Sequence, residues 1–296
     1  NWVRVLQESY HYSPCYFINS TKNILPVIIP MMEINSIITG KRGVCLPFTD
    51  YCVPVIPDKT YFKDIMDNIV VFGKNAGWKY IEFRGGENFP EDIQASLFFY
   101  GHTIDLSPGE DEIYSNFRDS TKRNIKKAIR EGVEVRILNT LEATEEFYRL
   151  NCLTRKEHGL PPQPFHFFRN IYEHIISKKL GFVVLATYDN KTIAGAVYFH
   201  FGGNAIYKYG ASAKEHQNLR ANNLVMWEAI KWYCRNGFKS FCFGRTEPEN
   251  EGLLQFKRGW GAEEHIINYY KYDFKKDKFV QDSSRLAGLH NKIFNK

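Results

Sequence analysis

A helix–glycine–strand unit occurs twice in this chain, and this repetition limits the possible folds more than any other feature. Residues 62–86 read as an amphipathic helix, a glycine, an aromatic-lysine pair and a strand that ends in arginine, and residues 224–245 have the same design. Gly77 and Gly237 each stand where a left-handed residue would end the helix. Because the two copies lie about one domain length apart, the repeat predicts a duplicated α/β domain.

The elements expected around this repeat favour an α+β fold with a mixed α/β sheet. Strand-like runs occur at 13–19, 25–33, 44–48 and 97–106, with turns expected at GKRG (40–43) and PDK (57–59). A charged helix over 112–132, a strand and helices at 141–159 and 165–178 come next. Three strands joined by Asp-Asn and Gly-Gly turns follow as hairpins, and helix, strand, helix and strand complete the chain.

A composition shift at SPGEDE, residues 107–112, marks the expected domain boundary. We therefore expect a first domain over residues 1–111, which the tail 278–296 could join, and a second domain over residues 112–277. The 44% hydrophobic and 16% aromatic content provides ample core material and excludes a disordered chain. The formal charge of +6 favours anionic partners such as nucleic acid, phosphorylated substrates or a membrane surface.

Neither a metal site nor a membrane-spanning segment is predicted. The six cysteines form no C-x-x-C pair and no histidine stands beside them at metal-ligand spacing, so reduced thiols in a cytoplasmic protein are expected. The apolar run at 25–34 is shorter than the ~20 residues that a span needs and contains two prolines. No basic-then-apolar leader is visible, although the chain opens on Asn1 rather than Met.

Several segments resemble FemAB-type proteins, the double-GNAT transferases that include the tRNA-dependent aminoacyl ligases of peptidoglycan bridges. The most specific are GRTEP (244–248) with LLQFKRGWGAEE (253–264), and KYGAS (208–212) with NNL (222–224). RKEHGLPPQPFHFF, STKRNIKKAIREGVEV and GKRGVCLPFTDY extend the resemblance over nearly the whole chain. It implies two GNAT-like subdomains with a cleft between them, and transfer of an acyl or aminoacyl group to an amine on a cell-envelope precursor.

The loop at residues 217–224 bears on the donor. Ordinary GNAT enzymes hold the CoA pyrophosphate in a glycine-containing turn at a helix N-terminus, where backbone N–H groups and the helix dipole bind phosphate. Here Asn222 and Asn223 stand where glycines would, and their side chains would crowd a phosphate. This disfavours acetyl-CoA. It agrees with the aminoacyl-tRNA donor that the resemblance implies, so no cofactor is expected and acyl-CoA is kept as the alternative donor.

Lys257 and Arg245 are the predicted catalytic residues. Lys257 matches the family's lysine near the donor, and it could neutralise the oxyanion that develops as an amine attacks an ester carbonyl. A solvated lysine on an exposed helix face is the alternative. Arg245 follows a glycine at a strand end, where site residues often lie, although an ion pair with Glu247 or Glu249 would also explain it. No nucleophile is evident, and direct attack by the acceptor amine needs no covalent intermediate.

A further set of residues is predicted to bind the anionic acceptor. Arg220 resembles a phosphate-binding position of the FemX-like ligases, and its planar fork suits a diphosphate. Lys41 and Arg42, in the loop before LPFTDY, could meet the same anion, although a charged hairpin tip is the simpler account. The complete set is Arg220, Lys41, Arg42, Asp50, Tyr51, Tyr209, Ser212, Asn222 and Arg258.

The charged helix predicted over 112–131 carries basic residues on one stripe, with Lys122, Arg123, Lys126 and Lys127 as candidates for binding nucleic acid. Such a stripe could follow a tRNA backbone, and a solvated helix face is the alternative. The sequence therefore predicts an aminoacyltransferase that moves an aminoacyl group from tRNA to a peptidoglycan precursor, in the cytoplasm or at the inner membrane surface. The alternatives are an acyl-CoA-dependent N-acyltransferase in polysaccharide or envelope biosynthesis, and a catalytically silent protein that binds tRNA or the precursor.

Overall fold

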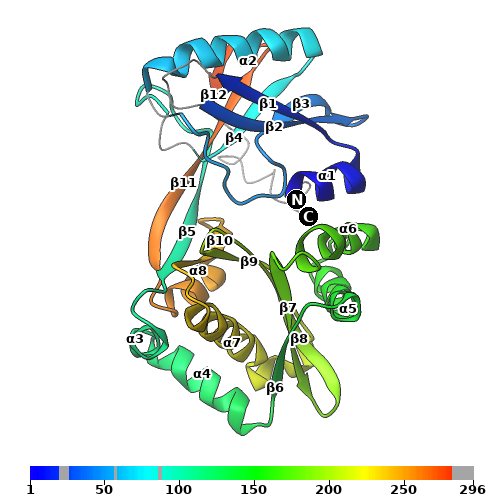
Figure 1. Ribbon diagram of the computed structural model, residues 1–296, viewed down its shortest axis with the longest axis vertical. Helices are drawn as coiled ribbons and strands as arrows, with labels where there is room; N and C mark the ends of the chain where they lie inside the picture. Colours follow the sequence, from blue (N-terminus) through cyan, green and yellow to red (C-terminus); the bar gives the residue numbers. More distant parts are fainter. Residues whose placement is uncertain (20–26, 57–58, 86–88, 282–296) are drawn as a thin grey trace. The chain divides into compact units, whose positions relative to one another are not determined.

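The computed structural model describes residues 1–19, 27–56, 59–85 and 89–281 (Figure 1). The chain forms two compact units, which we call the N-terminal unit (residues 6–100 and 266–281) and the C-terminal unit (residues 1–5 and 101–265). These divisions differ from the expected domain ends at residues 111 and 277. The reason is that two long strands, β5 (Leu97–Asp105) and β11 (Glu263–Asp273), each begin in one unit and end in the other.

The sheet of the N-terminal unit has the order β1-β2-β3-β4-β11, with β12 beside β11. Its strands are β1 (Ser13–Asn19), β2 (Val27–Ser36), β3 (Gly40–Val44), β4 (Tyr80–Arg84) and β12 (Lys278–Val280), and its helices are η1 (Lys59–Tyr61) and α2 (Phe62–Ala76). The short helix α1 (Trp2–Tyr10) contributes residues to both units. β3 and β4 run parallel, and the other pairs are antiparallel. α2 lies along one face of this sheet (Figure 1), and its buried residues belong to the same hydrophobic cluster as Ile29, Met31, Ile81 and Phe83.

The sheet of the C-terminal unit has the order β5-β10-β9-β8-β7-β6. Its remaining elements are α3 (Glu110–Ser115), α4 (Asp119–Arg130), β6 (Glu134–Leu138), α5 (Leu141–Glu157), α6 (Phe165–Ile171), η2 (Tyr172–Ile176), β7 (Gly181–Tyr188), β8 (Lys191–Phe201), β9 (Asn204–Ser212), η3 (Lys214–Leu219), α7 (Ala221–Arg235), β10 (Ser240–Thr246) and α8 (Glu251–Arg258). α5 and α6 cover one face of the sheet, and α7 with α4 covers the other (Figure 1). The expected mixed sheet is therefore confirmed.

The predictions that rested on local backbone chemistry are also confirmed. Gly77 and Gly237 both have φ of 72°, and each follows a helix and precedes a strand, as the repeat predicted. The Asp-Asn pair between β7 and β8 has φ values of 50° and 57°, and the Gly-Gly pair between β8 and β9 has 56° and 83°. Two consecutive residues with positive φ give the tight hairpin turn whose twist matches the strands on either side.

Three local predictions were wrong. The expected turn at 40–43 lies inside β3, and the real turn comes earlier, at residues 37–39. The strand expected at 44–48 ends at Val44, where a loop begins in which Leu46 and Phe48 have φ of 43° and 60°. The helix predicted over 112–132 is divided into α3 and α4, and the buried Phe117 lies between them. The backbone N–H of Arg118 bonds to the carbonyl of Gly259 instead of continuing a helix.

Candidate functional site

In the C-terminal unit, two neighbouring strands begin as a parallel pair and then separate. β9 and β10 are in register at Asn204–Ser240, Ala205–Phe241 and Ile206–Cys242, and their pairing stops there although both strands continue. Beyond this point, the backbone groups on the facing edges of β9 and β10 are not paired with each other. Most of the predicted catalytic and binding residues of this unit lie on these strand ends or on the helices that follow them.

A β-bulge in β9 directs two tyrosines to opposite faces of the sheet. Val197 pairs with Tyr209 and Tyr198 with Tyr207, so Lys208 is an extra residue on β9. Tyr209 consequently packs on the face that α5 and α6 cover, with its ring centroid 5.5 Å from that of Phe168 in α6. Tyr207 packs into the opposite core, where burial raises its pKa to about 12. Bulges often lie beside active sites because they re-aim one side chain in this way, so the placement of Tyr209 suits a binding residue.

Ser212 and Asn222, both predicted from the sequence, are in direct contact. The side-chain amide of Asn222, in the first turn of α7, donates to Ser212 Oγ at 3.2 Å. The backbone of Ser212 is fixed in turn by Thr154 Oγ1 of α5, at 3.1 Å and 3.2 Å. The Asn222–Ser212 bond joins the first turn of α7 to the end of β9, at a helix start where a glycine-containing turn would leave backbone N–H groups open to a phosphate. Arg220 precedes the helix with φ of 60°, and its side chain is exposed.

Lys257 is a buried residue, not the solvated lysine of the alternative reading. Its side chain is 2% exposed, and Nζ donates to the carbonyl of Gly244 at 2.9 Å and to that of Arg245 at 3.2 Å. Gly244 has φ of 70°, a conformation that glycine adopts without strain. A buried ammonium group is stable only when it is hydrogen-bonded, and these two carbonyls fix it at the end of β10. Lys257 and the backbone of Arg245 are thus brought together.

A buried histidine, which the sequence reading missed, lies in the same unit. His102 of β5 is fully buried, and its Nε2 is 2.9 Å from Glu264 Oε2. Burial and the nearby charge of Lys257 lower the pKa of His102. Glu264 also receives the side chain of Arg258, with Nε–Oε2 of 2.7 Å and Nη2–Oε1 of 2.8 Å. The guanidinium group of Arg258, a predicted substrate-binding residue, is therefore already bonded to Glu264. These hydrogen bonds from Arg258 lower the pKa of the Glu264 carboxyl.

Three buried polar atoms around these elements have no hydrogen-bond partner within the described ranges. They are His102 Nδ1 on β5, Thr246 Oγ1 at the end of β10 and Trp260 Nε1 just after α8. Buried polar atoms are nearly always hydrogen-bonded, and exceptions concentrate where a protein binds or transforms something. Neither Thr246 nor His102 could have been selected from the sequence, because a threonine and a histidine in apolar strands read as core residues.

The predicted residues of the N-terminal unit lie on β3 and on the loop that follows it. Arg84, at the end of β4, holds this loop: Nη1 donates to the carbonyl of Thr49 at 3.0 Å and Nε to Glu82 at 2.8 Å. The hydroxyl of Tyr269 donates to the carbonyl of Asp50. Tyr51 is 45% exposed. The repeat carried the signal for Arg84, since both copies end in arginine, but only Arg245 was selected from it.

Lys41 and Arg42 are strand residues, not part of a loop as the sequence suggested. Lys41 Nζ is 3.6 Å from a carboxylate oxygen of Glu33, and Arg42 donates to Thr39 Oγ1 and lies over the ring of Tyr80. Both side chains are partly exposed on a strand whose end leads into the loop with Asp50 and Tyr51. The four residues thus form one stretch of the N-terminal unit.

The basic stripe predicted for nucleic-acid binding lies on the outer face of α4. Its inner face buries Thr121, Ile125 and Ala128. Lys122 Nζ donates to the carbonyl of Ser115 at 2.7 Å, so this lysine also fixes the start of the helix. Arg123, Lys126 and Lys127 project from the other face, with no ion pair or side-chain hydrogen bond to the described part of the chain. Their charges are therefore available to an anion.

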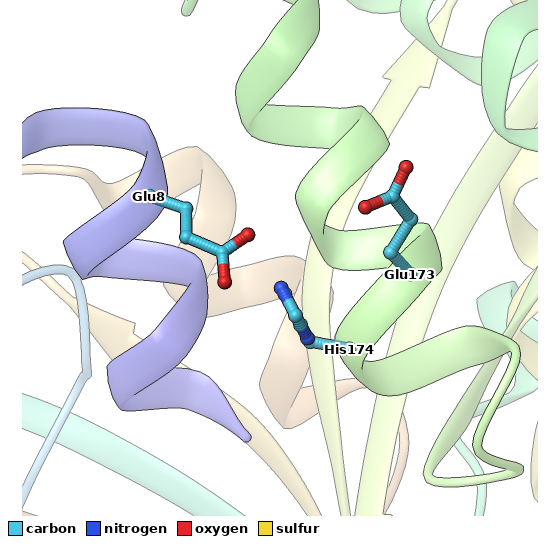
Figure 2. Close-up of side chains that lie close together, drawn as sticks. All are labelled: Glu8, Glu173 and His174. Atoms are coloured by element: carbon cyan, nitrogen blue, oxygen red, sulfur yellow. The ribbon is translucent and has the colours of Figure 1, made fainter.

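One group of side chains among the described residues has the composition of a metal site. Figure 2 shows Glu173 and His174, consecutive residues of η2, together with Glu8 of α1. Glu8 belongs to the N-terminal unit and the other two to the C-terminal unit, so the described residues define no metal site within either unit. All six cysteines carry free thiols. Among the helices of the described residues, none combines the length and apolar character needed to cross a bilayer.

Comparisons with known proteins show which family this chain belongs to. The acetyltransferase (GNAT) domain matches residues 115–258. The lipid II:glycine glycyltransferase of Staphylococcus haemolyticus is 32% identical over 285 residues, covering 72% of this chain and 66% of that protein. The UDP-N-acetylmuramoylpentapeptide-lysine N(6)-alanyltransferase of Weissella viridescens is 24% identical over 157 residues, 52% of this chain and 43% of that protein. The chain is a FemAB-type GNAT protein.

The fold of this FemAB-type protein also matches a solved structure of the family. The crystal structure of FemX superposes with a TM-score of 0.69 at 12% identity, covering 97% of this chain and 92% of that one. At this identity the likeness concerns the fold alone. The FemAB-type chain spans about two thirds or less of the length of the two relatives named above, so their activities do not pass to it without further argument.

Proposed function

We propose that this FemAB-type protein is an aminoacyltransferase that moves an aminoacyl group from aminoacyl-tRNA to an amine of a peptidoglycan precursor. Two relatives are named for transfer of glycine or alanine to such precursors, lipid II in one case and a UDP-linked muropeptide in the other. The anionic acceptor would be nucleotide- or lipid-linked. No metal or cofactor is required, because the ester of aminoacyl-tRNA already carries an activated acyl group.

The observation that carries this proposal is the buried, doubly hydrogen-bonded ammonium group of Lys257 at the end of β10. In the reaction the acceptor amine attacks the ester carbonyl carbon, a C–N bond forms, and the C–O bond to the tRNA ribose breaks. The amine loses a proton and the ribose oxygen gains one. Negative charge grows on the carbonyl oxygen meanwhile, and a fixed cation in a water-poor site stabilises that charge strongly. Lys257 is the residue to which we assign this role.

The residues around the separating strands would bind the two substrates. Arg220 is exposed beside the first turn of α7, and a guanidinium fork binds a diphosphate through two parallel hydrogen bonds. Tyr209, Ser212 and Asn222 line the same stretch of β9 and α7. Arg245, near the end of strand β10, would act next to Lys257. In the N-terminal unit, Lys41, Arg42, Asp50 and Tyr51 would bind the acceptor.

The test is aminoacyl transfer from charged tRNA to a UDP-linked muropeptide, with Lys257 varied. Lys257→Gln keeps a hydrogen-bond donor for the two carbonyls but removes the charge, so we expect the rate to fall about 100- to 1,000-fold with little change in unfolding midpoint. Lys257→Ala should lose as much activity and also destabilise the fold. Lys178→Ala, which removes an exposed lysine, is the matched control. A folded Lys257→Gln variant with the wild-type rate would show that the lysine is structural.

The donor is tested separately by calorimetry with acetyl-CoA and a longer acyl-CoA. Because the side chains of Asn222 and Asn223 stand at the start of α7, where a phosphate-binding turn has glycines, we expect no binding below roughly millimolar concentration, a free energy of about −4 kcal/mol. Micromolar binding would instead support an acyl-CoA-dependent N-acyltransferase. No transfer from either donor, with tRNA or the precursor bound but never used, would support the silent binding protein.

A further inference from the structure

The turn between β2 and β3 carries the two most exposed large apolar side chains of the described residues. Ile37 is 107% exposed and Ile38 is 86% exposed. They are the first two of the three turn residues that precede Gly40. Turn positions of this kind favour Asn, Asp, Ser, Gly and Pro, whose side chains or backbones suit the geometry. Neither turn formation nor core packing therefore explains why both positions hold isoleucine.

The hairpin that presents these residues is well defined. β2 and β3 pair in register up to Ser36 and Gly40, and the backbone N–H of Thr39 bonds to Ser36 Oγ at 3.3 Å. Gly40 has φ of 78°, and the side chain of Lys79 packs where a Cβ of residue 40 would be. These contacts hold the two ends of the turn and leave both isoleucines in contact with solvent. The exposure of Ile37 and Ile38 is thus a property of a turn that specific contacts hold in place.

Cations surround the base of the turn. Lys41 and Arg42 follow it on β3, and Lys79 lies against Gly40. The carboxylate of Glu33 lies 3.6 Å from Lys41 and also accepts from Trp78 Nε1 at 2.7 Å. Aliphatic side chains at a tip with cations behind them suit the surface of an anionic bilayer, where apolar groups enter the acyl boundary and cations meet lipid phosphates.

We propose that the β2–β3 turn is a membrane-docking element that inserts Ile37 and Ile38 into the surface of an anionic lipid bilayer. The attachment is weak and reversible, because it rests on two apolar side chains and a few basic ones. This inference deepens the proposed function, on which its biological meaning rests, because docking favours a lipid-linked acceptor over a nucleotide-linked one. The contact itself requires no turnover.

The test is co-sedimentation of the full chain with vesicles of phosphatidylcholine, with and without phosphatidylglycerol. We expect binding to the anionic vesicles and little binding to the neutral ones. Ile37→Ser combined with Ile38→Ser should lower the partition coefficient about tenfold, which corresponds to roughly 1.4 kcal/mol. Because both side chains are exposed, the unfolding midpoint should not change.

Phe201→Ser is the matched control, since Phe201 is 79% exposed at the β8–β9 hairpin, where a Gly-Gly turn follows it. We expect less than a twofold effect from it. The proposal would be overturned by an equal loss in the Phe201 variant, by equal binding to neutral vesicles, or by wild-type binding of the double variant. Binding that high salt abolishes completely and the isoleucine substitutions leave unchanged would assign the contact to basic residues elsewhere, such as those of α4.

Vesicle binding and aminoacyl transfer can fail independently. The isoleucine variant should transfer to a soluble UDP-linked acceptor at the wild-type rate, and its KM should rise for an acceptor embedded in anionic vesicles. A wild-type protein that binds vesicles but transfers nothing would contradict the proposed function and leave the docking element in place. Transfer to both acceptors with no vesicle binding would contradict the docking element alone.

Discussion

At the scale of single residues, the backbone of Gly244 decides where Lys257 can bond. Gly244 has φ of 70°, and its carbonyl accepts from Lys257 Nζ at 2.9 Å. A side chain in this left-handed conformation costs about 1 to 2 kcal/mol. We expect Gly244→Ala to lower the free energy of unfolding by that amount in urea titrations, and to lower the transfer rate as well because the lysine moves.

Gly252 provides the control for this prediction. It lies in α8, and a Cβ added there would meet nothing within 4 Å. Gly252→Ala should leave stability unchanged or raise it by up to about 1 kcal/mol, because alanine favours a helix. If both alanine variants had the same stability, strain at residue 244 would not be the cause.

His102 predicts a dependence of stability on pH. Burial and the charge of Lys257 lower its pKa in the folded chain, whereas an unfolded histidine titrates near about 6.5. Below that value the unfolded state binds more protons than the folded state, so the stabilisation is complete above about pH 6.5 and is lost as the pH falls toward the folded pKa. The free energy of unfolding should therefore be lower at about pH 5.5 than at about pH 7.5.

His102→Gln should reduce this difference between the two pH values, because glutamine keeps a donor for Glu264 but does not titrate. Lys178→Gln, at an exposed position, is the control and should keep the full difference. His200 should contribute in the same direction as His102, since burial also lowers its pKa. An unchanged pH dependence in the His102 variant would assign the effect to other groups.

At the scale of elements, α4 shows what a charge pattern in the sequence can predict: the face on which the basic residues lie. The stripe of Arg123, Lys126 and Lys127 lies on the outer face as its helical spacing predicted. If these residues contact tRNA phosphates, replacing all three with alanine should weaken tRNA binding and reduce the slope of log K against log salt by about 2 to 3. Replacement of the exposed Lys156 and Lys178 is the control. A slope that does not change would leave α4 a solvated face.

Other elements show why hydrophobic periodicity alone was not sufficient to predict where helices and turns begin and end. The break between α3 and α4 coincides with a hydrogen bond from the backbone N–H of Arg118 to the carbonyl of Gly259, more than a hundred residues away. No local pattern encodes such a contact. The turn between β2 and β3 was placed too late because its residues are isoleucines, which suggest a strand, and because the glycine that closes it lies inside β3. Helices and hairpins that depend on glycine or Asp-Asn conformations were predicted correctly, since their causes are local.

At the scale of the whole molecule, the difference between local and long-range causes also separates the candidate site residues that could be selected from the sequence from those that could not. Lys257, Ser212 and Asn222 lie in motifs that resemble a known family, and they could be selected residue by residue. His102 and Glu264 meet only in the folded chain, on β5 and β11. The expected domain ends were displaced for a related reason, because long strands shared by both units carry no turn signal at the point where the chain leaves a unit.

The order of segments along the chain makes the N-terminal unit depend on distant residues. β4 pairs with β11 through Tyr80–Asp273 to Arg84–Tyr269, so the N-terminal sheet is completed by a strand encoded near the other end of the described chain. A chain that ends at Arg258, the last residue matched by the GNAT domain, lacks this strand and leaves the edge of β4 unpaired. We expect it to lose hydrogen-exchange protection at the β4 amides that pair with β11, and to aggregate more readily. A chain that ends at Gln281 keeps β11 and β12 and is the control. Full protection of β4 in the shorter chain would mean that this sheet is stable without its last strands.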